Sequence, residues 1–365
     1  IGVIFGGRSV ELDVSIVSGQ VVMKGFAELS EYTVTPIYIA PDGRFVTFEK
    51  IPSIAEIKTA RDGKKTSKIL IECSTKQLVL ESTEGLVKKK KSIDCALPLT
   101  HGTNGEDGTL QGLLEMVNVP YVGCNVSASA LGMDKVHMKQ VFHSVGLPIT
   151  DHIWFLRSEW NENRAGILKR IEEKLQYPIF IKPANLGSSI GITKATDREM
   201  LEQAIEVAAH YDRKIIAEQG IPNVTEINCA LLGNENPMPS VLEQPLTFQA
   251  FLTFEEKYIQ KGGSMKGAKS RVKIPAPLPD EKTKEIKDLA IRVFKALDCS
   301  GTARVDFLLD ESLKVYVNEI NTIPGSLQQH LWKASGTPLP SLLKRLIELA
   351  LERHAEKQKN LTFYR

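Results

Sequence analysis

Cysteine is scarce in this sequence, and it has no long apolar run and no excess of either charge. The 365 residues include five cysteines and no Cys-x-x-Cys pair, which excludes a disulfide framework or a zinc site and favours reduced thiols in a cytoplasmic protein. No stretch approaches the roughly 18 apolar residues of a membrane span, and none has the pattern of a signal-peptide core. The net charge of +2 gives no indication of nucleic-acid binding. The remaining expectation is a soluble enzyme of about two to three domains.

The first 125 residues predict one α/β domain with a mainly parallel sheet. An apolar run over residues 1–5 ends at Gly6-Gly7, and the helical pattern that follows completes the first half of a βαβ unit. An alternating strand over 32–39 and a buried strand over 94–99 extend the sheet. Residues 68–80 are expected to form a hairpin or edge strands.

Two further units are predicted, a small α/β module over 126–217 and a C-terminal part over 218–365. The module has helical patterns over 134–145 and 197–210 and strands over 177–182 and 214–219. The C-terminal part has strands over 226–232, 303–309 and 314–320 and a closing helix over 339–352. Between the first two of these strands, residues from about 251 to 274 are rich in glycine and lysine, which is typical of a lid or a disordered loop.

The strongest chemical signal is a pair of strands near the C-terminus joined by a polar turn. If they form an antiparallel hairpin, the two-residue period puts Arg304 with Asp306 on one face and Glu319 with Asn321 on one face. If the two pairs share that face, their oxygens are the ligands that Mg²⁺ uses beside a nucleotide triphosphate. The alternative is a solvated strand face, which the apolar flanking residues disfavour.

Glycine-rich turns supply three weaker signals. Lys182 ends a strand just before Gly187-Ser188-Ser189, whose backbone amides and hydroxyls can cradle an anion, although an ordinary hairpin is the alternative and no Walker A sequence is present. The loop that starts at His101 follows a buried strand, where open α/β sheets bind ligands. The N-terminal Gly6-Gly7 lacks G-x-G-x-x-G, so a dinucleotide-binding oxidoreductase is disfavoured.

In this order, these segments resemble the D-alanine–D-alanine ligases of the ATP-grasp superfamily over nearly the whole chain. The specific motifs are HGTNGEDGTLQG (101–112), GMDKVHMK (132–139), KPANLGSSIGI (182–192), EEKY (255–258), ARVDF (303–307) and NEINTIPG (318–325). The resemblance implies an N-terminal parallel α/β domain followed by a two-part ATP-grasp fold, α+β in that part. It also implies ATP-dependent formation of D-alanyl-D-alanine for peptidoglycan precursors, through an acylphosphate, in a cytoplasmic homodimer.

The resemblance also assigns roles to individual residues. Glu11 would bind the ammonium of the first D-alanine, and Ser188 would link Glu11 to Tyr258 of the lid. His101 would lie beside the first substrate's carboxylate, and Arg304 with the amide of Gly325 would stabilise the oxyanion. The ATP-binding residues would be Lys139, Lys182 and Lys257 at the phosphates, Glu218 and Ile221 at adenine, Glu226 at ribose, and Ser189. Two Mg²⁺ or Mn²⁺ ions would be held by Asp306, Glu319 and Asn321.

One departure from the family pattern concerns the second substrate. Where the family commonly has Ser-Leu to bind the carboxylate of the second D-alanine, this chain has His330-Leu331. D-serine and D-lactate therefore remain alternatives as acceptors, although Lys257-Tyr258 is typical of dipeptide ligases. A non-enzymatic nucleotide-binding regulator is disfavoured, because none of the key residues is lost.

Overall fold

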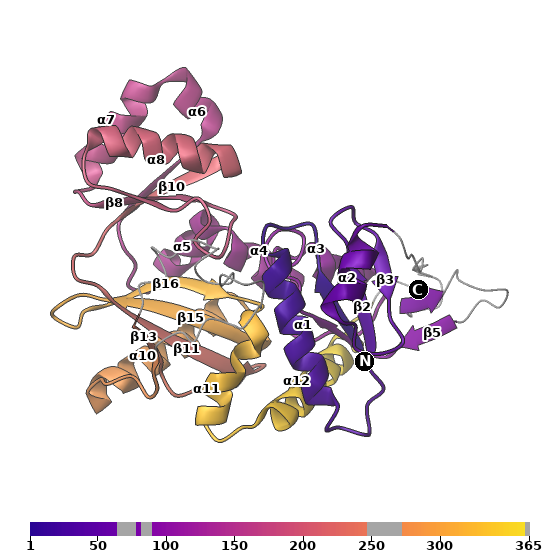
Figure 1. Ribbon diagram of the computed structural model, residues 1–365. Coiled ribbons are helices and arrows are strands. Elements are labelled where there is room, and N and C mark those ends of the chain that lie inside the picture. The colour runs from indigo at the N-terminus through magenta and orange to yellow at the C-terminus, as the bar shows by residue number, and fades with distance from the viewer. Residues whose placement is uncertain (64–77, 82–89, 247–271, 362–365) are drawn as a thin grey trace.

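The computed structural model describes residues 1–63, 78–81, 90–246 and 272–361. Three four-stranded sheets, each with its own helices, organise these residues (Figure 1). The predicted lid residues Lys257 and Tyr258 lie outside the described ranges, as does most of the predicted hairpin over 68–80. None of the helices in the described ranges is long and apolar enough to cross a membrane.

The N-terminal sheet is mainly parallel, as predicted. Strand β1 (Gly2–Gly6) pairs in parallel with β2 (Thr35–Ile39) and with β6 (Ala96–Pro98), and β3 (Phe45–Thr47) adds an antiparallel edge. Every residue of β1 and β2 is buried, which is typical of parallel strands covered on both faces.

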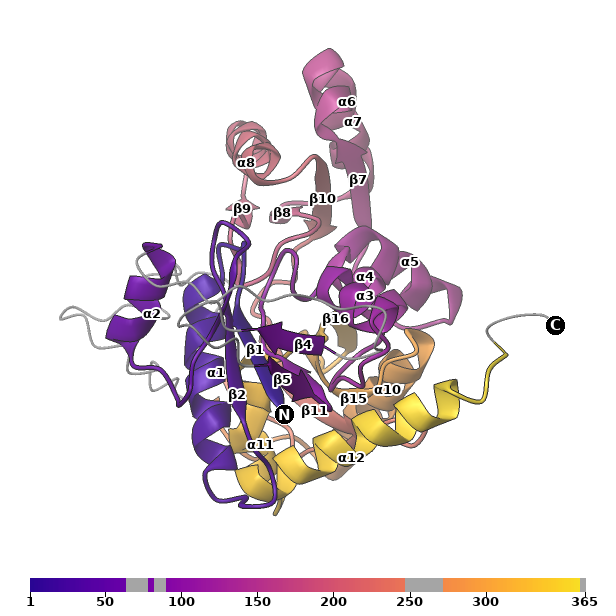
Figure 2. The same ribbon diagram turned by 90° about the vertical axis from the view of Figure 1, so that its right-hand side faces the viewer.

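Helices and a hairpin cover the two faces of the N-terminal sheet. One face packs on α1 (Leu12–Phe26) and on α12 (Leu339–Lys357), which returns from the C-terminal part (Figure 2). The other face packs on α3 (Thr109–Met116) and on the hairpin of β4 (Leu78–Glu81) and β5 (Lys90–Ile93). A short helix, α2 (Ile54–Arg61), starts with a capping box between Ser53 and Glu56.

The middle unit is an antiparallel sheet with helices on one face. Its strand order is β7 (His152–Leu156), β10 (Lys214–Gln219), β8 (Ile179–Pro183), β9 (Thr193–Ala195). Helices α6 (Arg157–Glu162), α7 (Arg164–Lys174) and α8 (Arg198–Tyr211) bury their apolar side chains against it. The predicted domain boundary at 217/218 falls inside β10.

The third sheet is antiparallel and has the order β12 (Met238–Pro239), β11 (Thr225–Gly233), β15 (Gly301–Leu309), β16 (Val315–Asn321). One face packs on α10 (Asp280–Ala296), α4 (Val126–Met133) and α5 (Lys135–Ser144). The chain then passes through a turn over Gly325–Gln328 and α11 (Gln329–Ala334) into α12. A two-stranded ribbon joins β13 (Gln244–Pro245) to β14 (Val272–Lys273).

Candidate active site

A cavity of about 1000 Å³ lies where the three units meet. Most of the residues predicted from the sequence line it: Glu11, His101, Lys182, Ser188, Ser189, Glu218, Ile221, Glu226, Arg304, Asp306, Glu319, Asn321, Gly325 and His330. They come from the residue before α1, the loop after β6, β8 and the glycine loop after it, β10 and the loop after it, the third sheet, and the turn and α11 that follow it. Segments distant in sequence therefore contribute to one site.

A β-bulge brings the two halves of the predicted hairpin onto the same face. Strands β15 and β16 are antiparallel, and the register pairs Asp306 with Glu319 but Phe307 with Val317, which leaves Asn318 as the extra residue. Without this extra residue, the side chain of Glu319 would point to the same buried face of the sheet as that of Val317. The bulge turns Glu319 and Asn321 to the cavity face that carries Arg304 and Asp306.

Arg304 and Asp306 form a bidentate pair on that face. The guanidinium donates from Nε and from one terminal nitrogen to the two carboxylate oxygens, each at 2.6 Å, and the amide of Asn321 donates to Oδ2 of Asp306 at 3.0 Å. Although burial alone would lower the pKa of Arg304, the adjacent carboxylate of Asp306 raises it. The arginine is therefore a permanent positive charge at the cavity wall.

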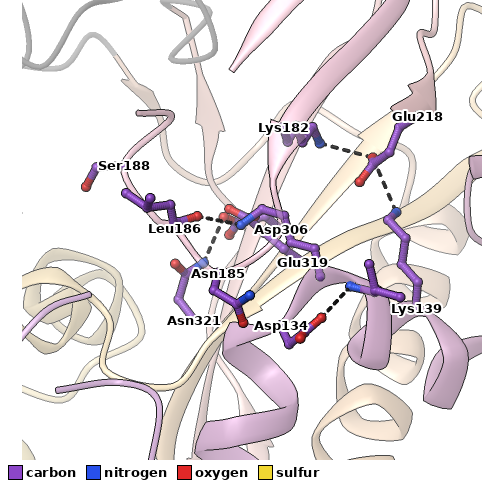
Figure 3. Close-up of polar contacts among 12 residues, drawn as sticks. Asp134, Lys139, Lys182, Asn185, Leu186, Ser188, Glu218, Asp306, Glu319 and Asn321 are labelled. Atoms are coloured by element: carbon purple, nitrogen blue, oxygen red, sulfur yellow. Dashed lines mark hydrogen bonds and ion pairs between the residues drawn. The ribbon is translucent and has the colours of Figure 1, made fainter. Parts of the chain in front are cut away.

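The donor set of Asp306, Glu319 and Asn321 fits a hard divalent cation. All three offer oxygens from one face of the hairpin, next to the lysines described below (Figure 3). Among the described residues, no three or more acidic, histidine or cysteine side chains form a metal-binding cluster, and the third oxygen of this set is the amide oxygen of Asn321. A cation there would compete with Arg304 for Asp306.

Two buried lysines converge on Glu218 (Figure 3). Oε2 of Glu218 lies 3.0 Å from Nζ of Lys182 and 3.4 Å from Nζ of Lys139. Burial would raise the pKa of Glu218, but the two ammonium groups lower it to about 2. Lys182 lines the cavity, whereas Lys139 lies behind Glu218 and does not line it. The predicted phosphate contact of Lys139 stays a prediction.

Sequence reasoning missed Lys135, which lies one helical turn before Lys139 on α5 and lines the cavity. Its Nζ donates to the carbonyl oxygen of Leu186 at 2.6 Å and lies 3.7 Å from Oε2 of Glu319. It therefore joins the glycine loop to the hairpin. The spacing of four residues within GMDKVHMK was the available signal, because it puts both lysines on one helix face.

Glu11 and Ser188 meet in the same cavity. Glu11 precedes α1 and is buried, and Ser188 Oγ donates a hydrogen bond to its Oε1. Ser188 and Ser189 have φ values of 52° and 59°, a left-handed turn that brings the loop onto Glu11. A Cβ on Gly187 would come within 2.9 Å of Glu11 Oε2, so any larger residue there would displace the Glu11 carboxylate.

His101 is held as a neutral imidazole. Burial lowers its pKa to about 4, and Ser18, a residue that sequence reasoning missed, contacts its Nε2 at 2.9 Å. The Ser18 hydroxyl oxygen also accepts a hydrogen bond from the amide of Ser326, at 2.9 Å. His101 can hold Ser18 and the turn after Gly325 in place, but it supplies no positive charge near neutral pH.

Ile221 and Glu226 line the same cavity, as do the apolar side chains of Phe180, Val224 and Leu308. Their predicted contacts with adenine and ribose stay predictions.

Glu106 is a third residue that the sequence analysis missed. Burial and the nearby negative charge of Glu11 raise its pKa to about 8. Its two oxygens accept from the amides of Gly102 at 2.7 Å and Ile323 at 3.3 Å, so one carboxyl group joins the His101 loop to the segment before Gly325.

Replacing Glu106 by glutamine should flatten the pH dependence of stability. Because the folded-state pKa is about 8 and the ordinary value is 4.5, the folded protein binds more protons in between, and stability falls as the pH rises through 8. His101 has the opposite slope but only below pH 6.5. We expect the melting temperature of the wild type to fall between pH 6.5 and 8.5 more steeply than that of Glu106→Gln. Parallel profiles would contradict the shifted pKa, and exposed Glu235→Gln is the control.

The acceptor residues predicted from the sequence have different surroundings. His330 lines the cavity and contacts Glu243, with Nε2 and Oε2 2.5 Å apart. The Leu331 side chain is fully buried in the apolar core shared with α12 and does not line the cavity. Any contact of Leu331 with a substrate would have to come from its backbone.

Comparison with known proteins finds family models and relatives that match nearly the whole chain. The family described as "D-ala D-ala ligase N-terminus" matches residues 1–124 and "D-ala D-ala ligase C-terminus" matches residues 141–348. A D-alanine--D-alanine ligase of Acetivibrio thermocellus is 41% identical, covering 98% of this chain and 97% of the relative. One of Geobacillus thermodenitrificans is 42% identical with the same coverage.

Solved structures give the same result. The D-alanine-D-alanine ligase of Coxiella burnetii superposes with a TM-score of 0.83 at 32% identity, covering 98% of this chain and 95% of that one. The VanG D-Ala:D-Ser ligase of Enterococcus faecalis has a TM-score of 0.78 at 32% identity, with coverage of 96% and 98%. The predicted fold class, an N-terminal α/β domain followed by an ATP-grasp fold, is confirmed. The chain belongs to the D-alanine–D-alanine ligase family.

Proposed function

We propose that this cavity joins two D-alanine molecules at the expense of ATP, forming D-alanyl-D-alanine, ADP and phosphate. The observation that carries the proposal is the bulged hairpin, which places Arg304, Asp306, Glu319 and Asn321 in the same cavity as Glu11 and Ser188. One wall thus suits phosphates and a developing oxyanion, and the other suits the ammonium group of an amino acid. Family membership supports the same reaction.

The reaction has two steps. A carboxylate oxygen of the first D-alanine attacks the γ-phosphorus of ATP, and the bond to ADP breaks. The amine of the second D-alanine then attacks the acylphosphate carbon, gives up a proton and expels phosphate. Both steps depend on positioning and on compensating charge.

Residues in different parts of the cavity have different roles in these two steps. Glu11, held by Ser188, binds the ammonium of the first D-alanine, and Lys182 and Lys135 face the phosphates. Arg304 and the amide of Gly325 stabilise the oxyanion of the tetrahedral intermediate. His330 binds the carboxylate of the second D-alanine.

A divalent metal would be held by Asp306, Glu319 and Asn321. When bound, two Mg²⁺ or Mn²⁺ ions would neutralise the charge of the ATP phosphates. In this proposal the enzyme is a cytoplasmic homodimer that supplies peptidoglycan precursors.

Phosphate release from ATP with Mg²⁺ tests the proposal, with D-alanine alone and then with D-serine or D-lactate added and products identified by mass. We expect D-alanyl-D-alanine from D-alanine alone. His330 and the likeness to a D-Ala:D-Ser ligase make a mixed product the second candidate. Turnover only with a mixed pair would keep the mechanism and change the acceptor, and no turnover with any pair would contradict the proposal.

A further inference from the structure

Glu243 is a buried carboxylate in the cavity that the mechanism above does not use. It lies on the segment that follows β12 and runs along β11, where its backbone exchanges two hydrogen bonds with Asn228, at 2.8 and 3.0 Å. Asn228 is in turn opposite Asp306 in the neighbouring strand. The main chain of Glu243 is therefore fixed to the sheet that carries Arg304 and Asp306.

The side chain of Glu243 reaches His330. Their contact is 2.5 Å long, and the exposed fractions of the two side chains are 6% for Glu243 and 48% for His330. Burial would raise the pKa of Glu243, but the hydrogen bond from His330 and the positive charges of His330 and Arg304 lower it. Glu243 is thus ionised and accepts from Nε2 of the ring.

The shape of the backbone before His330 explains why a hydrogen bond from Glu243 matters for the orientation of its ring. Ser326, Leu327 and Gln328 have φ values of 47°, 56° and 52°, an irregular left-handed run before the six-residue helix α11. Leu327 and Gln328 are buried, which fixes the turn, but the half-exposed ring of His330 extends beyond it. A hydrogen bond to a carboxylate on a rigid sheet selects one orientation of this ring.

We propose that Glu243 is a positioning residue for the second substrate and that it acts through His330. By accepting from Nε2, it fixes the orientation of the ring and leaves Nδ1 as the ring nitrogen for the acceptor's carboxylate, to which a doubly protonated ring can donate. Arg304, on β15, is a positive charge near Glu243, and it interacts in turn with Asp306 and Glu226. Lys333, three residues after His330 on α11, also lines the cavity. The inference rests on the proposed function, because it concerns the acceptor of that reaction.

Steady-state kinetics of Glu243→Gln, His330→Ser and the double variant test the coupling. The dependence of the rate on D-alanine separates a donor KM from an acceptor KM. For Glu243→Gln we expect the acceptor KM to rise about tenfold while kcat and the KM values of donor and ATP change less than about threefold. In the His330→Ser background the same substitution should add less than about twofold, because the group it positions is gone. Exposed Glu235→Gln is the matched control.

A second measurement reports on the His330 ring directly. In the wild type, long-range ¹H–¹⁵N spectra should contain a protonated Nε2 resonance that His330→Ser removes. An unprotonated His330 Nε2, an unchanged acceptor KM in folded Glu243→Gln, or an equal effect of Glu243→Gln in both backgrounds would each overturn the inference. If the wild type itself forms no dipeptide, the proposed function fails, which is a different outcome.

Discussion

Replacing Glu319 by alanine is expected to reduce dipeptide formation by at least roughly a thousandfold. Only two carboxylates, Asp306 and Glu319, belong to the proposed metal site, and Asp306 is already shared with Arg304. Without Glu319 the site keeps one contested carboxylate and one amide, which is too little negative charge to hold a divalent ion beside ATP. Phosphate release over a Mg²⁺ titration measures the loss.

The fold should survive this substitution. Lys135, the cation near Glu319, loses this contact at 3.7 Å, but its ammonium keeps the hydrogen bond to the carbonyl oxygen of Leu186 at 2.6 Å. We expect a melting temperature close to that of the wild type and no effect of Glu311→Ala, which removes an exposed carboxylate from the turn of the same hairpin. Near-normal turnover at saturating Mg²⁺ would show that Glu319 is not a metal ligand.

Local patterns in the sequence predicted most of the strands that form the site. The strand over 214–219 has the bounds of β10, and the hairpin of β15 and β16 is antiparallel as expected. The alternation of apolar and polar residues along the hairpin indicates which of its side chains face the core. Two-residue periodicity could not show that Glu319 shares a face with Asp306, because that depends on the bulge at Asn318.

Residues that act through tertiary contacts could not be predicted in this way. Ser18 is inside a helix, and its role arises from His101 and Ser326, which are distant in sequence. The role of Glu243 likewise depends on a residue distant in sequence, because its partner His330 is 87 residues away. The motifs indicated residues that carry chemistry themselves, whereas residues that hold those groups in place have no local signature. Helices α6, α7 and α10 were also not predicted.

Replacing Arg304 by alanine should lower kcat by about a hundredfold to a thousandfold and change the KM for ATP much less. The charge of Arg304 matters most when the carbonyl oxygen becomes an oxyanion, so its loss affects the transition state more than substrate binding. The pair with Asp306 adds a second effect, because the substitution leaves the buried Asp306 with the amide of Asn321 as its described donor. A modest loss of thermal stability should therefore accompany the loss of turnover.

Arg304→Lys separates the two effects. Lysine keeps the positive charge but cannot form the two parallel hydrogen bonds that Arg304 makes with Asp306. We expect it to recover part of the stability and only a small part of kcat, because a single ammonium attracted to Asp306 is not directed at the oxyanion. Single-turnover rates with ATP saturating distinguish slow chemistry from slow product release. Equal losses in kcat and in ATP binding for Arg304→Ala would instead mean that Arg304 acts on the nucleotide, and the oxyanion would then depend on the amide of Gly325.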